Sequence, residues 1–123
     1  MLQVHLNEKD FIAILKPNGP LHESDFTSAG DIIDPFIEDT GKLKGIIIYV
    51  KSFSGWDSFA ARVSHLTFIN GYHKKVSKVA FVTDSIVEEF TEQIGRHFIS
   101  AEIKTFPFDN FEEAKNWILN NKI

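Results

Sequence analysis

The chain has 123 residues, no Cys and twelve Phe, and 43% of its residues are hydrophobic. This size and composition predict a single domain over residues 1–123, with a core that needs no disulfides. The lack of Cys excludes disulfide frameworks, thiolate zinc sites and cysteine nucleophiles, and the formal charge of −4 argues against nucleic acid as a partner.

The first strands are predicted near the amino terminus. Apolar residues alternate with polar ones over 2–6, and a buried run follows at 11–15, which together indicate a hairpin. The stretch 1–6 lacks a basic segment and a long apolar segment, and no run reaches the ~20 apolar residues needed to span a bilayer. We therefore expect a cytoplasmic protein with no transmembrane segment.

A helix is predicted next, from Ser24 or Asp25 as N-cap to Gly41 as left-handed C-cap. Pro35 lies inside its apolar pattern, so we expect a kink there, or a restart with Asp34 as cap. Three further helices are expected after the strands that follow. One is capped near Asp57 and extends to Asn70-Gly71, and the other two begin near Asp84-Ser85 and Asp109.

The strand at 46–50 is apolar on both faces, which is typical of the middle of a parallel sheet. Strands at 76–82 and 99–105 follow, the last with the alternation of an edge strand. The predicted order is β-β-α-β-α-β-α-β-α. This indicates an α/β fold with a mixed, mainly parallel five-stranded sheet and about four helices.

Strands in sequence order joined by right-handed crossovers would place the helices on one face of this sheet. The other face would then need a cover, such as a partner subunit, a bent helix or a ligand. Because an uncovered sheet face or an exposed helix could pair with a second copy of the chain, we also predict a homodimer.

The loops 16–20, 51–57, 83–85 and 106–109 should meet at the carboxyl ends of the parallel strands, where open α/β folds place ligands. We therefore predict a binding loop at this rim, comprising Phe53, Gly55, Trp56 and Asp57, with Asp84 nearby. A Ser beside a helix start, such as Ser54, can be phosphorylated. Capping of the helix by Ser and Asp is the ordinary alternative, and for Asp84 the alternatives are capping or binding a cation.

No nucleophile elbow, phosphate-binding glycine loop or dinucleotide fingerprint occurs, and the five His show no metal-ligand spacing. The sequence therefore predicts no enzyme activity, no metal and no cofactor. His65, on the helix after the binding loop, is the one His singled out for inspection. The many aromatic residues are compatible with an apolar pocket, although aromatic residues at strand and helix positions usually form the core.

The pattern resembles the SpoIIAA-like family, relatives of STAS domains and of the lipid-binding CRAL-TRIO (SEC14-like) fold. The resemblance covers nearly the whole chain and rests on short motifs in a fixed order: 46–50, Phe53, Gly55-Trp56, 79–84, Phe98, Ala101-Glu102, Phe106, Ala114 and Trp117-Ile118. STAS relatives act in partner switching, in which a Ser or Thr at the start of the helix after the central strand is phosphorylated.

The resemblance implies two candidate phosphoacceptors, Ser58 because it follows Asp57, and Ser54. It also implies an apolar pocket, whose predicted lining is Trp56, Phe59, Val63, Leu66, Ile86, Val87 and Phe90. The leading hypothesis is a non-enzymatic regulatory or binding module that acts through protein-protein contacts around the binding loop. The alternative is the binding of an apolar small molecule or lipid, with association to a membrane.

Overall fold

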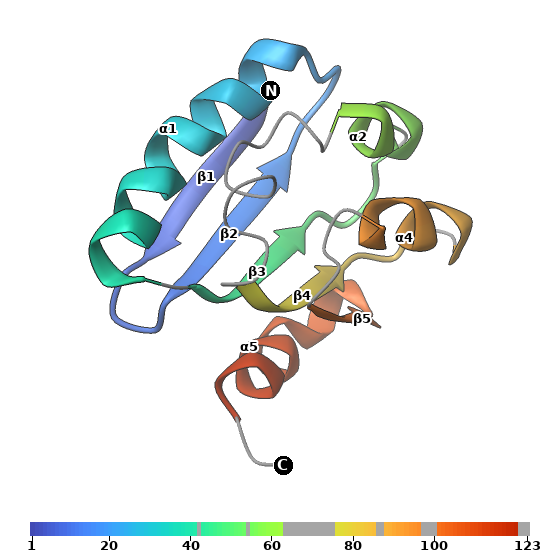
Figure 1. Cartoon of the computed structure of the whole chain (residues 1–123). Coiled ribbons are helices and arrows are strands. Elements are labelled where there is room, and N and C mark those ends of the chain that lie inside the picture. Colours follow the sequence, from blue (N-terminus) through green and yellow to red (C-terminus); the bar gives the residue numbers. More distant parts are fainter. Residues whose placement is uncertain (42, 54, 63–75, 86–87, 97–100, 121–123) are drawn as a thin grey trace.

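The computed structural model describes residues 1–41, 43–53, 55–62, 76–85, 88–96 and 101–120 (Figure 1). Strands and helices alternate after an initial hairpin, as the sequence predicts. The elements are β1 (Leu2–Asn7), β2 (Ile12–Pro17), α1 (Glu23–Thr40), β3 (Leu43–Tyr49), α2 (Trp56–Arg62), β4 (Val76–Val82), α4 (Glu88–Gly95), β5 (Glu102–Phe106), the 3-10 turn η3 (Phe108–Asn110) and α5 (Phe111–Leu119).

The five strands form one mixed sheet in the order β1-β2-β3-β4-β5. β1 pairs with β2 antiparallel, whereas β2, β3, β4 and β5 pair parallel. β3 is central and its Ile46, Ile47 and Ile48 are at most 1% exposed. The predicted fold class and the edge position of the last strand are confirmed.

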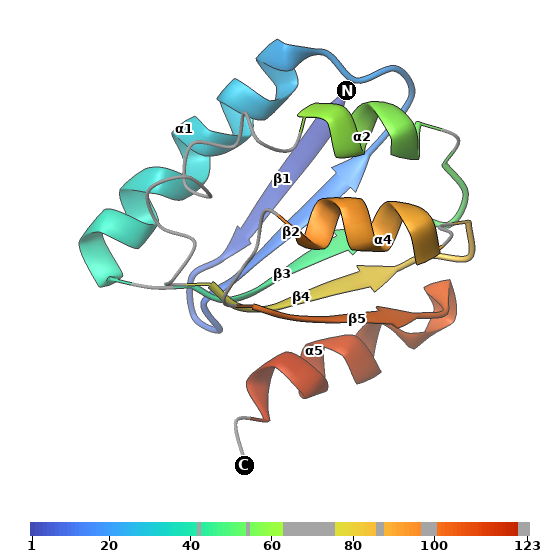
Figure 2. The same ribbon diagram turned by 45° about the vertical axis from the view of Figure 1, so that its right-hand side comes forward.

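One face of the sheet is covered by α1, α2 and α4 (Figure 2). Phe26, Ile33 and Ile37 of α1 pack there against apolar side chains of the strands, among them Ile46 and Phe81. The spacing of the apolar residues along α1 matches the helical period, so the helix buries a single stripe. This is the larger of the two cores.

The opposite face is covered by α5, the last helix among the described residues, as Figure 2 shows. Ala114 and Ile118 of α5 pack against Ile47, Ala80 and Val82 of the strands. The expectation that a partner, a bent helix or a ligand must cover this face is therefore wrong. The handedness rule applies to a helix between two parallel strands, and α5 follows the last strand, so the rule leaves its face open.

Lys78 of β4 points to this second face and holds the end of α5. Its side chain is 9% exposed, and its Nζ donates to the carbonyl oxygens of Trp117 at 2.8 Å and Asn120 at 3.3 Å. The ammonium also lies 4.9 Å from the centre of the Trp117 ring. Carbonyls at a helix C-terminus lack partners in the helix and carry partial negative charge, so a buried cation is favourable there.

Helix α1 departs from the prediction at two places. His22 takes the N-cap position, and the Asp25 carboxylate accepts a hydrogen bond from the His22 N–H at 2.8 Å, so neither Ser24 nor Asp25 is the N-cap. The helix also continues through Pro35, which excludes the predicted restart at Asp34, while the alternative, a kink at Pro35, stays a prediction. Pro35 is exposed, which lets water replace the hydrogen bond that proline cannot make.

The other end of α1 agrees with the sequence. Gly41 has φ 87°, in the left-handed region, and its N–H donates to the Ile37 carbonyl at 2.7 Å. Glycine enters this region without the steric cost that a Cβ would bring. The predicted C-cap is confirmed.

Candidate functional site

The loops at the carboxyl ends of the parallel strands are joined to one another by backbone hydrogen bonds. The Asp84 N–H donates to the Lys51 carbonyl at 3.2 Å, which ties the loop after β4 to the loop after β3. The Thr83 N–H donates to the Phe106 carbonyl at 3.0 Å, which ties it to the end of β5. The loops after β3, β4 and β5 are therefore connected, and the fourth predicted loop, after β2, meets the loop after β3 at a pocket.

The Ser85 hydroxyl is the anchor of the binding loop. Its Oγ accepts hydrogen bonds from the Phe53 N–H at 3.0 Å and from the Trp56 indole Nε1–H at 3.1 Å. Thr83 Oγ1 lies 3.1 Å from the same Ser85 oxygen and accepts the Ser85 N–H at 3.2 Å. One hydroxyl group thus holds both the backbone and an aromatic side chain of the loop.

The direction of these hydrogen bonds follows from counting lone pairs. Both lone pairs of Ser85 Oγ are used by Phe53 and Trp56, so its hydrogen must be donated to Thr83 Oγ1. Thr83 Oγ1 then accepts two hydrogen bonds from Ser85 and donates its own hydrogen to the Lys51 carbonyl at 3.4 Å. Every polar atom of this small network has a partner, which favours a single loop conformation.

Asp84 performs a similar task on the other side of the rim. Its Oδ1 accepts the Phe108 N–H at 2.9 Å. The Phe108 ring stacks on Tyr49 of β3, with centres 4.7 Å apart and planes 7° apart. Asp84 and Ser85 are consecutive, yet they fix two different loops, the one before η3 and the one before α2.

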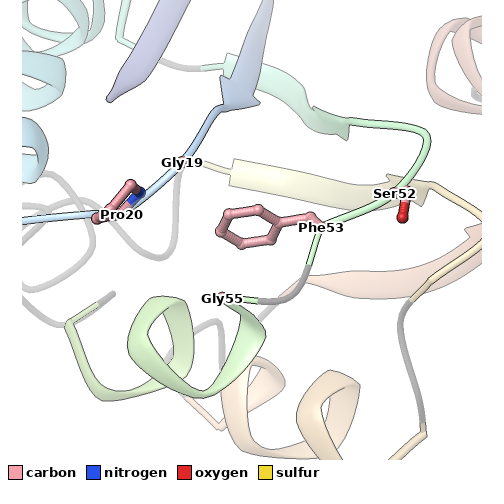
Figure 3. A pocket seen from close by; sticks show the side chains of 5 residues that line it. All are labelled: Gly19, Pro20, Ser52, Phe53 and Gly55. Carbon is pink, nitrogen blue, oxygen red and sulfur yellow. The ribbon is translucent and has the colours of Figure 1, made fainter.

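A pocket of about 290 Å³ opens on the outer side of the binding loop (Figure 3). Its described lining residues come from the loops after β2 and β3 and are Gly19, Pro20, Ser52, Phe53 and Gly55. The Phe53 ring extends from its loop toward Gly19 and Pro20, as Figure 3 shows. Phe53 is only 8% exposed, so its contact with this pocket is a small part of its surface.

Gly55 lets the Phe53 ring fold back over its own loop. A Cβ placed on Gly55 would lie 2.7 Å from Cζ of Phe53, which is closer than such atoms approach. The Gly55 carbonyl also accepts the Phe59 N–H at 2.9 Å, so α2 begins at Trp56 and Gly55 takes the N-cap position. The helix predicted to be capped at or near Asp57 thus begins one residue before it.

The predicted phosphoacceptors, Ser54 and Ser58, are close in sequence to the residues 52–55 that line this pocket. Ser58 is in the first turn of α2 and its side chain is half-buried. Ser54 lies outside the described residues. Whether either one is phosphorylated stays a prediction.

Three aromatic and four aliphatic residues are predicted to line an apolar pocket. Trp56 and Phe59 are 2% and 1% exposed, and their rings make edge contacts with Phe53, Phe26 and Phe81 inside the larger core. Phe90 is half-buried and packs against the same core. The remaining four, Val63, Leu66, Ile86 and Val87, lie outside the described residues, as does His65.

In the described ranges no group of three or more His, Asp or Glu side chains is arranged to hold a metal ion. Within the same ranges no helix is long and apolar enough to cross a membrane.

Two features of this site were missed in the sequence. Ser85 is predicted in the rim loop 83–85 and at a helix start, but its hydrogen bonds to the neighbouring loop are not predicted, although a hydroxyl directly after a buried strand is well placed to reach that loop. Gly19 and Pro20 belong to the predicted rim loop 16–20, but the sequence does not predict that they line a pocket with Phe53. The sequence feature that could have revealed both roles is the predicted meeting of the four loops, which places residues 19–20 beside residues 52–55.

A family model described as SpoIIAA-like matches residues 12–119, which include all of the rim. Neither the search of curated proteins nor the search of solved structures finds a significant match.

Proposed function

The chain belongs to the SpoIIAA-like family, a group related to STAS regulatory and binding modules, and from this premise we propose that it is a single-domain, cytoplasmic module that binds another protein. The proposed contact surface is the binding loop with the start of α2. The role is non-enzymatic. Occupation of this surface would itself be the regulatory signal.

The observation that carries this proposal is the combination of a fixed loop and an open pocket beside it. The Ser85 hydroxyl holds Phe53 and Trp56, so the loop does not have to be ordered when a partner arrives. Preorganisation of this kind lowers the entropic cost of association. Protein interfaces commonly concentrate their affinity in a few side chains inserted into such pockets.

The size of the pocket favours a protein partner over an apolar small molecule. About 290 Å³ lies at the lower limit of the roughly 300–1,000 Å³ that small-molecule sites occupy. Trp56 and Phe59, two residues of the predicted apolar lining, are already buried against other rings. A lipid would have to displace them, so lipid binding is the weaker alternative.

Regulation by phosphorylation is a second part of the proposal. Ser58 lies two residues after Trp56, in the first turn of the helix that the binding loop precedes. A phosphate there would add roughly 1.5 to 2 negative charges beside the proposed contact surface. Ser58, or Ser54, would then change the affinity for the partner without any change of fold.

The experiment that tests the proposal is photo-crosslinking inside the host cell. A photoreactive amino acid replaces Ser52, which is exposed at the pocket, or Ser28, which is exposed on α1 as the matched control. We expect a discrete covalent adduct with another protein from position 52 and none from position 28. Identical adducts at both positions, or no adduct at position 52, would contradict a protein partner at this surface.

A further inference from the structure

β5 is the last strand of the sheet, and within the described residues no other strand pairs with its outer edge. Figure 2 shows β5 at the border of the sheet, on the far side from β1. The apolar residues of α5 pack on Ile47 of β3 and Ala80 of β4, so the axis of this helix lies inward of the edge. Three side chains of β5 are exposed: Glu102, Lys104 and Thr105. An open edge of this kind can pair with a further strand.

The backbone groups available at the outer edge belong to alternate residues of β5. The Phe106 carbonyl accepts the Thr83 N–H at 3.0 Å, so the backbone groups of Phe106 point inward, toward β4. In a strand the N–H and C=O of one residue point to the same side, and those of the next residue point to the opposite side. The N–H and C=O groups of Ile103 and Thr105 therefore point outward, where they can bond to another chain.

The side chains of β5 are divided between the two faces of the sheet. Lys104 lies on the α5 face, where its Nζ is 5.2 Å from the centre of the Phe106 ring and 6.0 Å from the centre of the Trp117 ring. Glu102 shares this face, because successive side chains of a strand alternate. Ile103 lies on the other face and packs against the larger core. The edge thus carries one acidic and one basic side chain on the same face, two positions apart.

This order of charges is complementary to itself when two copies of β5 run antiparallel. With Ile103 opposite Ile103 of the second copy, each Glu102 lies directly opposite a Lys104, so the attractive pair occurs twice. Moving the centre to Glu102 or to Lys104 places two like charges directly opposite each other, which is unfavourable. In the first register the outward N–H and C=O groups of the two Ile103 residues also bond to each other. The other edge strand, β1, has no Asp, Glu, Lys or Arg and offers no such selection.

We propose that β5 is a homodimer interface, in which it pairs antiparallel with β5 of a second copy about Ile103 and joins two five-stranded sheets into one. Such a contact is two-fold symmetric, so it uses both edges and closes after two copies. It differs from a dimer through the sheet face, which α5 covers. The inference goes beyond the proposed function, because the binding loop follows β3, two strands away from this edge.

The test is sedimentation velocity of the purified full chain at protein concentrations from about 5 µM to about 500 µM. We expect a monomer-dimer equilibrium in this range. Glu102→Lys and Lys104→Glu each place like charges opposite each other and should raise the dimer Kd roughly tenfold. The double variant Glu102→Lys/Lys104→Glu restores complementary pairs and should return to the wild-type Kd. Glu8→Lys and Lys9→Glu, at exposed neighbouring positions before β2, are the matched controls and should leave the Kd unchanged.

Hydrogen exchange of the wild-type chain locates the contact without any substitution. The Ile103 amide should exchange roughly fivefold more slowly at the highest protein concentration than at the lowest, because pairing protects it. The Lys9 amide should exchange at the same rate at both. A chain that stays monomeric throughout, or an equal Kd in wild type and both single reversals, would overturn the proposal. An Ile103 amide that exchanges independently of concentration would overturn pairing through β5 even if a dimer forms.

Discussion

Gly45 of β3 lies directly against Ile118 of α5. A Cβ placed on Gly45 would be 2.6 Å from Cγ2 and 2.8 Å from Cδ1 of Ile118, so α5 can approach the sheet only because this residue has no side chain. Gly45 is also paired in the sheet with Lys78, whose ammonium holds the carbonyls at the end of the same helix. Gly45 and Lys78, neighbours on adjacent strands, thus both contact α5.

Gly45→Ala is expected to destabilise the protein by about 1–3 kcal/mol, because the added methyl group overpacks the interface with Ile118. Truncating the opposing residue should relieve this. Ile118→Ala should cost less free energy of unfolding in the Gly45→Ala background than in the wild type, by about 0.5–3 kcal/mol. Urea denaturation of the four proteins measures the coupling, and strictly additive effects would show that the two residues do not compete for space.

Lys78→Met should reduce the free energy of unfolding by about 1.5–3 kcal/mol, the range for hydrogen bonds to a charged group. Methionine retains an apolar chain of similar length but leaves the Trp117 and Asn120 carbonyls without their donor. Lys104→Met is the matched control, since Lys104 is exposed and lies 6.0 Å from the same Trp117 ring. If both substitutions cost the same free energy of unfolding, the helix end does not depend on Lys78.

Thr83→Val is expected to loosen the binding loop. The substitution keeps the shape but removes the oxygen that accepts from the Ser85 hydroxyl and the Ser85 N–H. Leaving these donors without a partner in a residue that is 4% exposed should cost about 1–3 kcal/mol. Thr105→Val in exposed β5 provides the control, and the Trp56 indole N–H signal should shift only in Thr83→Val. An unshifted indole signal would argue against the Thr83-Ser85-Trp56 connection.

Ser58 is predicted to carry a phosphate in protein purified from its own host. Denaturing mass analysis should then show a population heavier by one phosphate, and peptide mapping should place it on Ser58 or Ser54. Ser58→Ala removes the modification if Ser58 is the acceptor, while Ser52→Ala leaves it in place. A native mass spectrum of the same sample serves as a check on the alternative function, because an apolar molecule lost on denaturation would favour lipid binding.

The sequence alone determined the elements and their order. A strand that is buried on one face has alternating apolar and polar residues, and a strand that is buried on both faces has a continuous apolar run. The alternation at 2–6 therefore indicated a half-exposed strand, and the apolar run at 46–50 indicated a central one. Chain connectivity then implied parallel pairing, and parallel pairing implied that four loops meet at one rim. The family resemblance added Ser58 as a candidate phosphoacceptor and the predicted lining of an apolar pocket, and the match over residues 12–119 supports that assignment of family.

Only the tertiary structure decided which groups meet across the chain. The face taken by α5 depends on packing between Gly45 and Ile118, which lie 73 positions apart, and no periodicity records that contact. Pro20 and Phe53 form a pocket, and Ser85 reaches Phe53, because sheet register places their loops together. The local sequence pattern indicates how each segment is buried. The hydrogen-bond partner of a hydroxyl or an ammonium group, in contrast, depends on distance and direction in the folded chain.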